Sequence, residues 1–200
     1  SRTRIMRGAL MRRNRHVLRN SPRSFRRDCR GLAAVEFAFI LPLMLVLFFA
    51  MVETTNGVAI DRKVTLTART LSDIVSQAMS VTDLDIANSF LASSAILQPY
   101  SSGPVQAVIS AVKIDADKNA TVVWSKGWSE GAVVAGRTPG PVVLPPAFLI
   151  ENTYLIWGEV SYLYRPSVPY LIKSGITLSD QSFSRPRQSD CVLYQQTKCP

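Results

Sequence analysis

The sequence predicts an α+β protein in which an N-terminal transmembrane helix continues into a stem helix and packs against a small antiparallel β-sheet. Three observations predict this class. A largely apolar run fills residues 32–52, apolar residues then recur at helical spacing up to residue 78, and β-branched segments dominate the chain after residue 104. A chain of 200 residues supplies one ordinary domain plus an anchor, which excludes a large multidomain enzyme.

Positive charge is concentrated at the N-terminal end of the chain. Residues 1–30 contain eleven arginines and one acidic residue, Asp28, whereas the remaining chain has 12 basic and 13 acidic residues. A basic surface spread over a folded domain would indicate a nucleic-acid partner, but a charged segment beside an apolar run instead sets membrane orientation. We therefore predict a cytoplasmic leader and no nucleic-acid partner. The sequence begins with Ser, so translation is expected to start upstream or at Met6 or Met11.

The apolar run has the length of a membrane span. Its 21 residues, 32–52, would form a helix of about 31 Å, which matches the hydrocarbon core of a bilayer. Glu36 is the one charged residue in the run and Pro42 the one proline. Because Lys and Arg close to a span stay on the cytoplasmic side, the N-terminus is expected inside, the chain after residue 53 outside, and membrane lipid around the helix.

Two other targeting signals were weighed against a permanent span. A cleaved secretory signal has a shorter apolar core, followed by small residues that the stretch after Phe49 lacks. Arg26-Arg27 would suit a twin-arginine signal, but Phe25 and Asp28 fit that signal poorly. Both alternatives are therefore disfavoured.

The junction between leader and span resembles a known processing site. Arg30-Gly31 followed by Leu32-Ala-Ala-Val-Glu36-Phe37 is similar to the class III signal site of type IV prepilins, with Gly before the cut and Glu at the fifth mature position. The continuation through Pro42 resembles the TadE/TadF/TadG-like proteins of the tight-adherence (Tad or Flp) pilus machinery, which read G-x-A-x-V-E-F-A-L-x-x-P here. The resemblance covers about 25 residues strongly.

This resemblance implies a function in pilus assembly. A prepilin peptidase would cut between Gly31 and Leu32, and Glu36 and Phe37 would serve assembly, with Glu36 pairing with the new ammonium group on Leu32 of a neighbouring subunit. The implied partners are other pilins and pseudopilins, Tad assembly proteins and the prepilin peptidase. The implied location is the bacterial inner membrane, with the C-terminal domain in the periplasm and incorporation into the pilus left open.

We accordingly expect four parts in the chain. They are a basic cytoplasmic leader at 1–31, a transmembrane helix at 32–53, a periplasmic stem helix at 54–80, and a periplasmic α+β domain with a C-terminal disulfide loop at 81–200.

Two helices are expected beyond the membrane. The stem carries apolar residues three and four apart, and we expect them to pack on the protein's own domain rather than bind a partner: Ile60, Val64, Ala68, Leu71, Val75 and Ala78. Arg69 and Asp73 are four residues apart and can pair on the exposed face. A second helix, capped by Thr82 or Asp83, would carry four apolar residues: Leu84, Ile86, Phe90 and Leu91.

The strands are expected in the following stretches: 105–114, 121–124, 154–164 and 175–183. Asp115–Asn119 reads as a hairpin turn, and the Gly- and Pro-rich residues 127–146 as a long surface loop. The turn is superficially similar to a calcium loop. Ala120 stands where such a loop requires Gly, and Lys126 where it requires Glu, so we predict no metal site.

The three cysteines fall on both sides of the predicted membrane. Cys191 and Cys199 lie on the oxidising outer side and are predicted to form a structural disulfide, while Cys29 lies inside. A zinc site is disfavoured because no further Cys or His lies outside to complete its coordination.

The sequence offers no catalytic constellation. Its one histidine, His16, lies in the leader, so Ser-His and Cys-His catalysis are not expected in the external domain, and no phosphate-binding loop or cofactor motif is present. We predict a non-enzyme without cofactors. The favoured function is that of a TadE-like pseudopilin or minor pilin in assembly of an adhesive Tad pilus. The alternative is an uncleaved single-pass anchor that binds a cell-envelope partner. A third hypothesis, an arginine segment that binds anionic lipid or nucleic acid, ranks below both.

Overall fold

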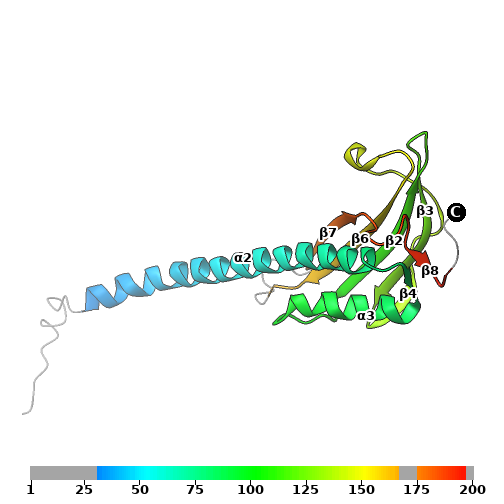
Figure 1. Ribbon diagram of the computed structural model, residues 1–200. Coiled ribbons are helices and arrows are strands. Elements are labelled where there is room, and N and C mark those ends of the chain that lie inside the picture. The colour runs from blue at the N-terminus through cyan, green and yellow to red at the C-terminus, as the bar shows by residue number, and fades with distance from the viewer. Residues whose placement is uncertain (1–30, 167–174, 197–200) are drawn as a thin grey trace, which may run out of the picture. The chain divides into compact units, whose positions relative to one another are not determined.

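The computed structural model describes residues 31–166 and 175–196. The chain divides into two units, Ser1–Val46 and Leu47–Pro200. The predictions for the arginine leader, for Cys29 and for Cys199 lie outside the described residues. The α+β class is confirmed, because a long apolar N-terminal helix is followed by an antiparallel sheet (Figure 1).

The helices come first along the chain. Helix α2 spans Leu32–Ser76 and contains Pro42. It ends before the expected boundary at residue 80, because Ser80 already belongs to the short strand β1, Ser80–Val81. Helix α3 follows at Asp83–Ser94 and continues into a short 3₁₀ turn, η2, at Ala95–Leu97.

Six strands form one antiparallel sheet. They are β2 (Val105–Ile114), β3 (Ala120–Ser129), β4 (Ala132–Ala135), β5 (Gly140–Val142), β6 (Thr153–Tyr164) and β7 (Ile176–Ser184). The order is β4-β3-β2-β6-β7, and β5 also pairs with β3. A 3₁₀ turn, η3 at Pro146–Phe148, precedes β6, and the terminal strand β8 at Leu193–Tyr194 pairs in parallel with β1.

The prediction of a long loop at 127–146 was wrong. Strand β3 continues to Ser129, and β4 and β5 both lie within the stretch. Glu130 and Gly131 both have positive φ, 51° and 83°, and they form a two-residue turn of the kind that closes tight hairpins. The glycines in this stretch therefore belong to turns between short strands rather than to one long loop.

The start of α3 follows the prediction. Thr82 forms a capping box with Asp85, whose backbone N–H donates to the Thr82 hydroxyl over 3.3 Å while the Thr82 N–H donates to the Asp85 carboxylate over 2.9 Å. Of the four apolar residues expected on this helix, Ile86 and Phe90 are buried, whereas Leu84 and Leu91 are exposed.

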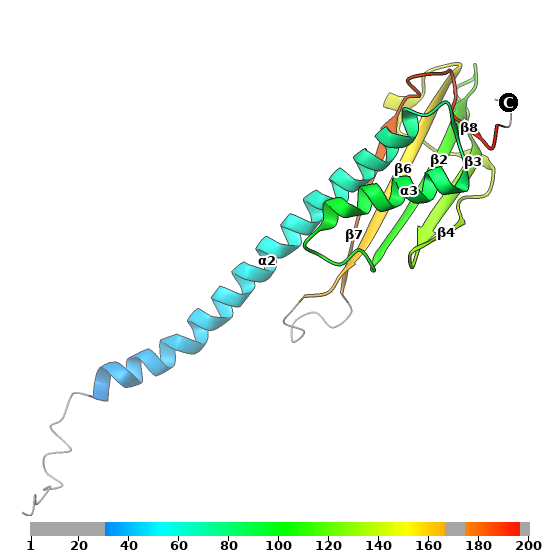
Figure 2. The ribbon, with the colours of Figure 1, turned by 60° about the horizontal axis from the view of Figure 1, so that its bottom comes forward.

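Both helices lie on the same face of the sheet, where the main core forms (Figure 2). Of the six stem residues expected to pack on the domain, five are buried: Ile60, Val64, Ala68, Leu71 and Val75. The sixth, Ala78, lies beyond the end of α2 and is partly buried against the same core. Strands contribute alternate residues to this face, such as Ile109 on β2 and Ile156 on β6. The C-terminal part of α2 is therefore a core element of the domain.

Gly158 of β6 lies where α2 comes closest to the sheet. A Cβ atom at this position would meet the carbonyl oxygen of Ala68 at 3.1 Å and the Cβ of Ser72 at 3.2 Å. The absence of a side chain thus allows the helix to approach the strand. No larger residue fits there unless the helix shifts.

A second, smaller core lies on the opposite face near the Asp115–Asn119 turn. Val112, Ile114 and Trp157 pack there with residues around η3, and Phe148 and Phe183 have ring centroids 4.4 Å apart. The remainder of this face is open and polar.

Candidate functional site

The predicted cleavage site lies at the start of α2. Leu32 is the first residue of the helix and is 61% exposed. Gly31 precedes it and is exposed, and a Cβ atom at this position would meet nothing within 4 Å. The peptide bond predicted to be cut therefore lies at the junction of helix and leader, where no described residue covers it.

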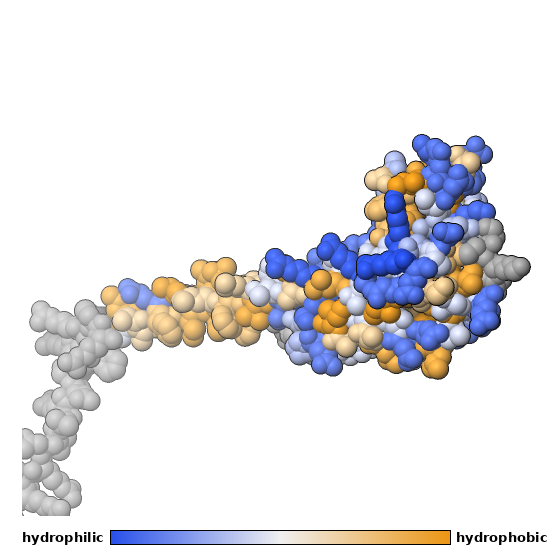
Figure 3. Space-filling view, viewed as in Figure 1, coloured by the Kyte–Doolittle hydropathy of each residue, from blue (hydrophilic) through white to orange (hydrophobic). Residues whose placement is uncertain are grey.

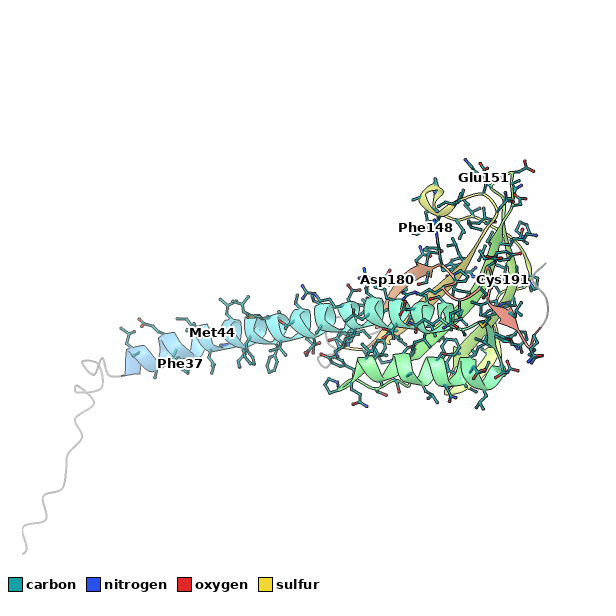
Figure 4. The ribbon with its side chains drawn as sticks, in the orientation of Figure 1. Phe37, Met44, Phe148, Glu151, Asp180 and Cys191 are labelled. Carbon is teal, nitrogen blue, oxygen red and sulfur yellow. The ribbon has the colours of Figure 1, made fainter. Side chains whose placement is uncertain are left out.

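Glu36 and Phe37 lie one turn into the same helix. Both side chains are exposed, and within the described residues no ion pair of Glu36 is formed. Figure 4 shows Phe37 and Met44 projecting from the helix away from its axis. Because residues four apart share a helix face, Glu36 and Leu32 lie on the same face of α2, one turn apart.

The N-terminal part of α2 is apolar on all sides. Within the described residues it is the one helix long and apolar enough to cross a membrane, with a mean hydropathy of 2.5 over its best 18-residue window, none of which is buried. Figure 3 shows this stretch as an almost continuous hydrophobic surface. Its length and composition allow it to span a bilayer.

The comparison with protein families decides how this segment is classified. The model of the TadE-like protein family matches residues 31–71. Residues 31–71 are similar to TadE-like proteins. The resemblance inferred from Gly31, Glu36 and Pro42 is thereby confirmed, and the match connects the chain with Tad pilus assembly. The searches of curated proteins and of solved structures returned no match.

The TadE-like segment extends well beyond the apolar run. It includes the predicted cleavage site and Glu36 and ends at Leu71, inside the stripe that packs on the sheet. The match therefore joins two physically different stretches of one helix, a bare apolar stretch and a buried stem.

Glu53, the first polar residue after the apolar run, is hydrogen-bonded to strand β6. The Tyr164 hydroxyl donates a hydrogen bond to Glu53 Oε2 over 2.6 Å. Burial, together with the hydrogen bond to Glu53, raises the pKa of Tyr164 to about 12. The bond links the end of β6 to the helix directly after the apolar run.

Lys63 makes a second link between the stem and the domain. Its ammonium group donates to the carbonyl oxygens of Ile96 and Gln98 over 2.8 and 2.7 Å. These carbonyls end the α3–η2 helical stretch, where a cation complements the helix dipole. Lys63 lies outside the apolar stripe of the stem, and its spacing along the helix does not indicate this partner.

Asp73 pairs differently from the prediction. The expected partner was Arg69, but Asp73 forms its ion pair with Arg187 of the C-terminal segment and also accepts a hydrogen bond from Gln77 over 2.8 Å. The partner lies more than a hundred positions away, so helical spacing could not reveal it.

The C-terminal segment, residues 185–196, is hydrogen-bonded to β3 and to the start of α3. Trp124 Nε1 donates to the Val192 carbonyl over 2.9 Å, and Tyr194 donates to Asp83 over 2.8 Å. The Lys126 ammonium group also lies 3.1 Å from the Asp83 carboxylate. The hydrogen bonds from Tyr194 and then from Lys126 lower the pKa of the Asp83 carboxyl. Cys191 is buried and disulfide-bonded. Its pairing with Cys199 stays a prediction.

The Asp115 carboxylate is occupied by its own turn. It accepts hydrogen bonds from the backbone N–H groups of Asp117 and Asn119 over 2.9 and 2.8 Å and from the Asn119 amide over 3.1 Å. The bond from Asn119 is the main reason that the pKa of Asp115 is lowered. These contacts give the carboxylate a structural role in closing the hairpin.

One polar depression was not foreseen from the sequence. It has a volume of about 560 Å³ and lies on the open face of the sheet, lined by Gln106, Arg137, Glu159, Ser161, Ser179 and Gln181 among others. Arg137 donates two hydrogen bonds to Glu159, over 2.9 and 2.6 Å, and its guanidinium carbon lies 4.3 Å from the centre of the Trp157 ring. Arg137 belongs to the stretch expected to be a loop, so no signal pointed to this contact.

Proposed function

We propose that the chain is a pseudopilin or minor pilin of a Tad pilus, anchored in the inner membrane by α2 and carrying its folded domain in the periplasm. The TadE-like match over residues 31–71 supports the connection with pilus assembly. In this proposal a prepilin peptidase removes the leader between Gly31 and Leu32, and the mature helix packs with helices of other pilins. The pilus serves surface adherence.

Exposure of Glu36 within an apolar helix is the observation that carries the proposal. The neighbouring side chains of the same stretch, such as Phe37 at 59% and Phe39 at 79% exposure, are fully available for lipid or for other helices. A carboxylate inside a membrane helix is costly and usually marks a function. Its cost falls when a cation meets it in the same low-dielectric layer.

Cleavage would create that cation. Hydrolysis of the bond after Gly31 leaves a free ammonium group on Leu32, one turn from Glu36. Within one helix the two groups lie on the same face, and between adjacent helices in register the carboxylate of one subunit can meet the ammonium group of the next. Mutual neutralisation would favour lateral packing of mature helices over uncut ones.

The domain is proposed to act without catalysis. Its polar contacts, such as Lys63 with the α3–η2 carbonyls and Asp73 with Arg187, fix elements to one another. We propose that it caps, primes or stabilises the assembling pilus through its surface.

Mass and N-terminal analysis of the native protein tests the proposal. The protein is isolated from its membrane in strains with and without the prepilin peptidase. We expect a mature chain that begins at Leu32 when the peptidase is present and an uncut chain when it is absent. An uncut chain in both strains would contradict processing and favour a permanent single-pass anchor.

A further inference from the structure

We propose that one end of the sheet, formed by the exposed residues Pro104, Arg165 and Ile176 around the buried Tyr164, rests on the phospholipid headgroups of the membrane that α2 spans. This end is called the membrane-facing end below. The inference rests on the proposed membrane anchor and adds a surface that neither the family match nor the apolar run assigns.

The first step is the depth of the helix residues that follow the apolar run. Residues 47–52 are exposed and apolar, and they are followed by Glu53, Thr54, Thr55 and Asn56. The headgroup layer adds about 5–7 Å to each side of the hydrocarbon core. At about 1.5 Å per residue, these four polar residues match the thickness of that layer.

The second step is the contact between this polar turn and the sheet. Tyr164 donates to Glu53 over 2.6 Å, and a Cβ atom at Gly57 would lie 3.9 Å from the Tyr164 ring. Tyr164 is therefore held beside residues 53–57.

The third step is the set of side chains around Tyr164. Ile176 pairs directly with Tyr164 at the start of β7 and is 41% exposed. Arg165 follows Tyr164 and is exposed, as is Pro104, whose carbonyl accepts from the Leu163 N–H over 3.5 Å. The exposed aliphatic side chain of Ile176 and the cation of Arg165 suit a surface of acyl chains, phosphates and water, while the buried Tyr164 holds them beside residues 53–57.

The opposite end of the sheet has a different character. The β2–β3 turn contains Asp115 and Asp117, and Lys118 is paired with Glu151 over 3.4 Å. This end has a net negative charge and would be repelled by anionic lipid. At the Tyr164 end Arg165 is offset by Glu130, which lines the same hollow beside Pro104, so this end has less net negative charge than the opposite one. The hydrogen bond of Tyr164 to Glu53 is what assigns this end to the membrane.

The experiment measures the depth of single spin labels in the full chain. A Cys29→Ser background is reconstituted into vesicles of phosphatidylethanolamine and phosphatidylglycerol, and one label is placed by Thr177→Cys, Asp117→Cys or Phe39→Cys. All three positions are exposed. Relaxation by oxygen, which concentrates in lipid, is compared with relaxation by a water-soluble nickel chelate.

We expect the Phe39 label to lie in lipid and the Asp117 label in water. The Thr177 label should lie at headgroup depth and should be less accessible to the nickel chelate than the Asp117 label. A Phe39 label in water would remove the membrane anchor and with it the proposed function. If the Phe39 label lies in lipid but Thr177 is as accessible to nickel as Asp117, only the present inference is overturned.

A charge reversal provides a second test. Arg165→Glu should repel the anionic headgroups and raise the nickel accessibility of the Thr177 label. The matched control is Arg185→Glu, an exposed arginine just beyond the other end of β7, which should leave that accessibility unchanged. Equal accessibility in the two variants would overturn the inference, and preserved thermal unfolding excludes loss of the fold as the cause.

Discussion

The two stretches of α2 bury their apolar residues in different ways. Residues 32–52 are apolar on every side except at Glu36, and none of the best membrane window is buried. From Ile60 to Val75 the buried apolar residues form one stripe, and Leu66, which lies outside it, is 49% exposed. Polar residues such as Asp61, Arg62 and Arg69 occupy the other sides of the second stretch. The same secondary structure is therefore long and apolar enough to cross a membrane in one stretch, and packs into a protein core in the other.

This difference shows that the two stretches of α2 can have independent roles. In the proposed function, side chains of the first stretch contact the membrane and helices of other pilins. In the second stretch, each stripe residue fills part of the core against β2, β3 and β6. Equivalent substitutions in the two stretches should therefore affect different properties, and the following predictions test that separation.

The largest expected effect follows loss of charge in the first stretch. Glu36→Gln should abolish pilus formation, because the proposed partner of the Leu32 ammonium group disappears, while insertion into the membrane should be kept or improved. Counts of pili and membrane fractionation measure the two properties. Glu130→Gln, which removes a charge from an exposed turn, is the control and should leave pili unchanged. Normal pili with Glu36→Gln would contradict the assembly function.

The second prediction compares one substitution in both stretches. Leu71 is 1% exposed and Leu43 61% exposed. Leu71→Ala should lower the free energy of unfolding by about 2–5 kcal/mol because it leaves a cavity in the core. Leu43→Ala should leave domain stability unchanged. Thermal unfolding in detergent followed by circular dichroism distinguishes them, and equal losses would show that the two stretches are not separate in function.

The third prediction concerns the helix–sheet contact. Gly158→Ala should destabilise the domain by about 1–3 kcal/mol, since the new methyl group meets Ala68 and Ser72 of α2 at 3.1–3.2 Å. Gly57→Ala is the matched control. There the nearest atom lies at 3.9 Å, so the better helix propensity of Ala should stabilise by up to about 1 kcal/mol. Chemical denaturation measures both, and stabilisation by Gly158→Ala would refute the close approach.

The smallest expected effect comes from the link after the apolar run. Tyr164→Phe removes the hydrogen bond to Glu53 and keeps the ring, so it should cost about 1 kcal/mol. Denaturation at neutral pH measures this loss. A variant as stable as the wild type would show that the bond does not hold the sheet to the helix.

The same tyrosine gives a pH dependence. Its pKa is raised to about 12 from the ordinary 10.0, so its contribution to stability is fully present below about pH 10 and is lost as the pH rises toward 12. The difference in unfolding free energy between the wild type and Tyr164→Phe should therefore shrink across this window. A constant difference from pH 9 to pH 12 would contradict the raised pKa.

Local patterns predicted most of the elements because their causes are local. The apolar run, the stripe from Ile60 to Val75 and the Thr82 cap each depend on neighbours within a few positions. The stretch 127–146 was misread for the same reason. Its glycines look like loop residues in sequence, and only the pairing of Lys126 with Ala135 and of Ala120 with Val142 turns it into strands.

The sequence by itself determined the membrane-length helix, the TadE-like segment with Gly31 and Glu36, the amphipathic stem and the strand-rich domain. The tertiary structure alone decided that Asp73 forms an ion pair with Arg187, that Arg137 forms an ion pair with Glu159, and that Tyr164 donates a hydrogen bond to Glu53. The first set follows from the spacing of residues along a helix or strand. The second joins residues from 22 to 114 positions apart, whose proximity depends on how the sheet and helices pack as a whole.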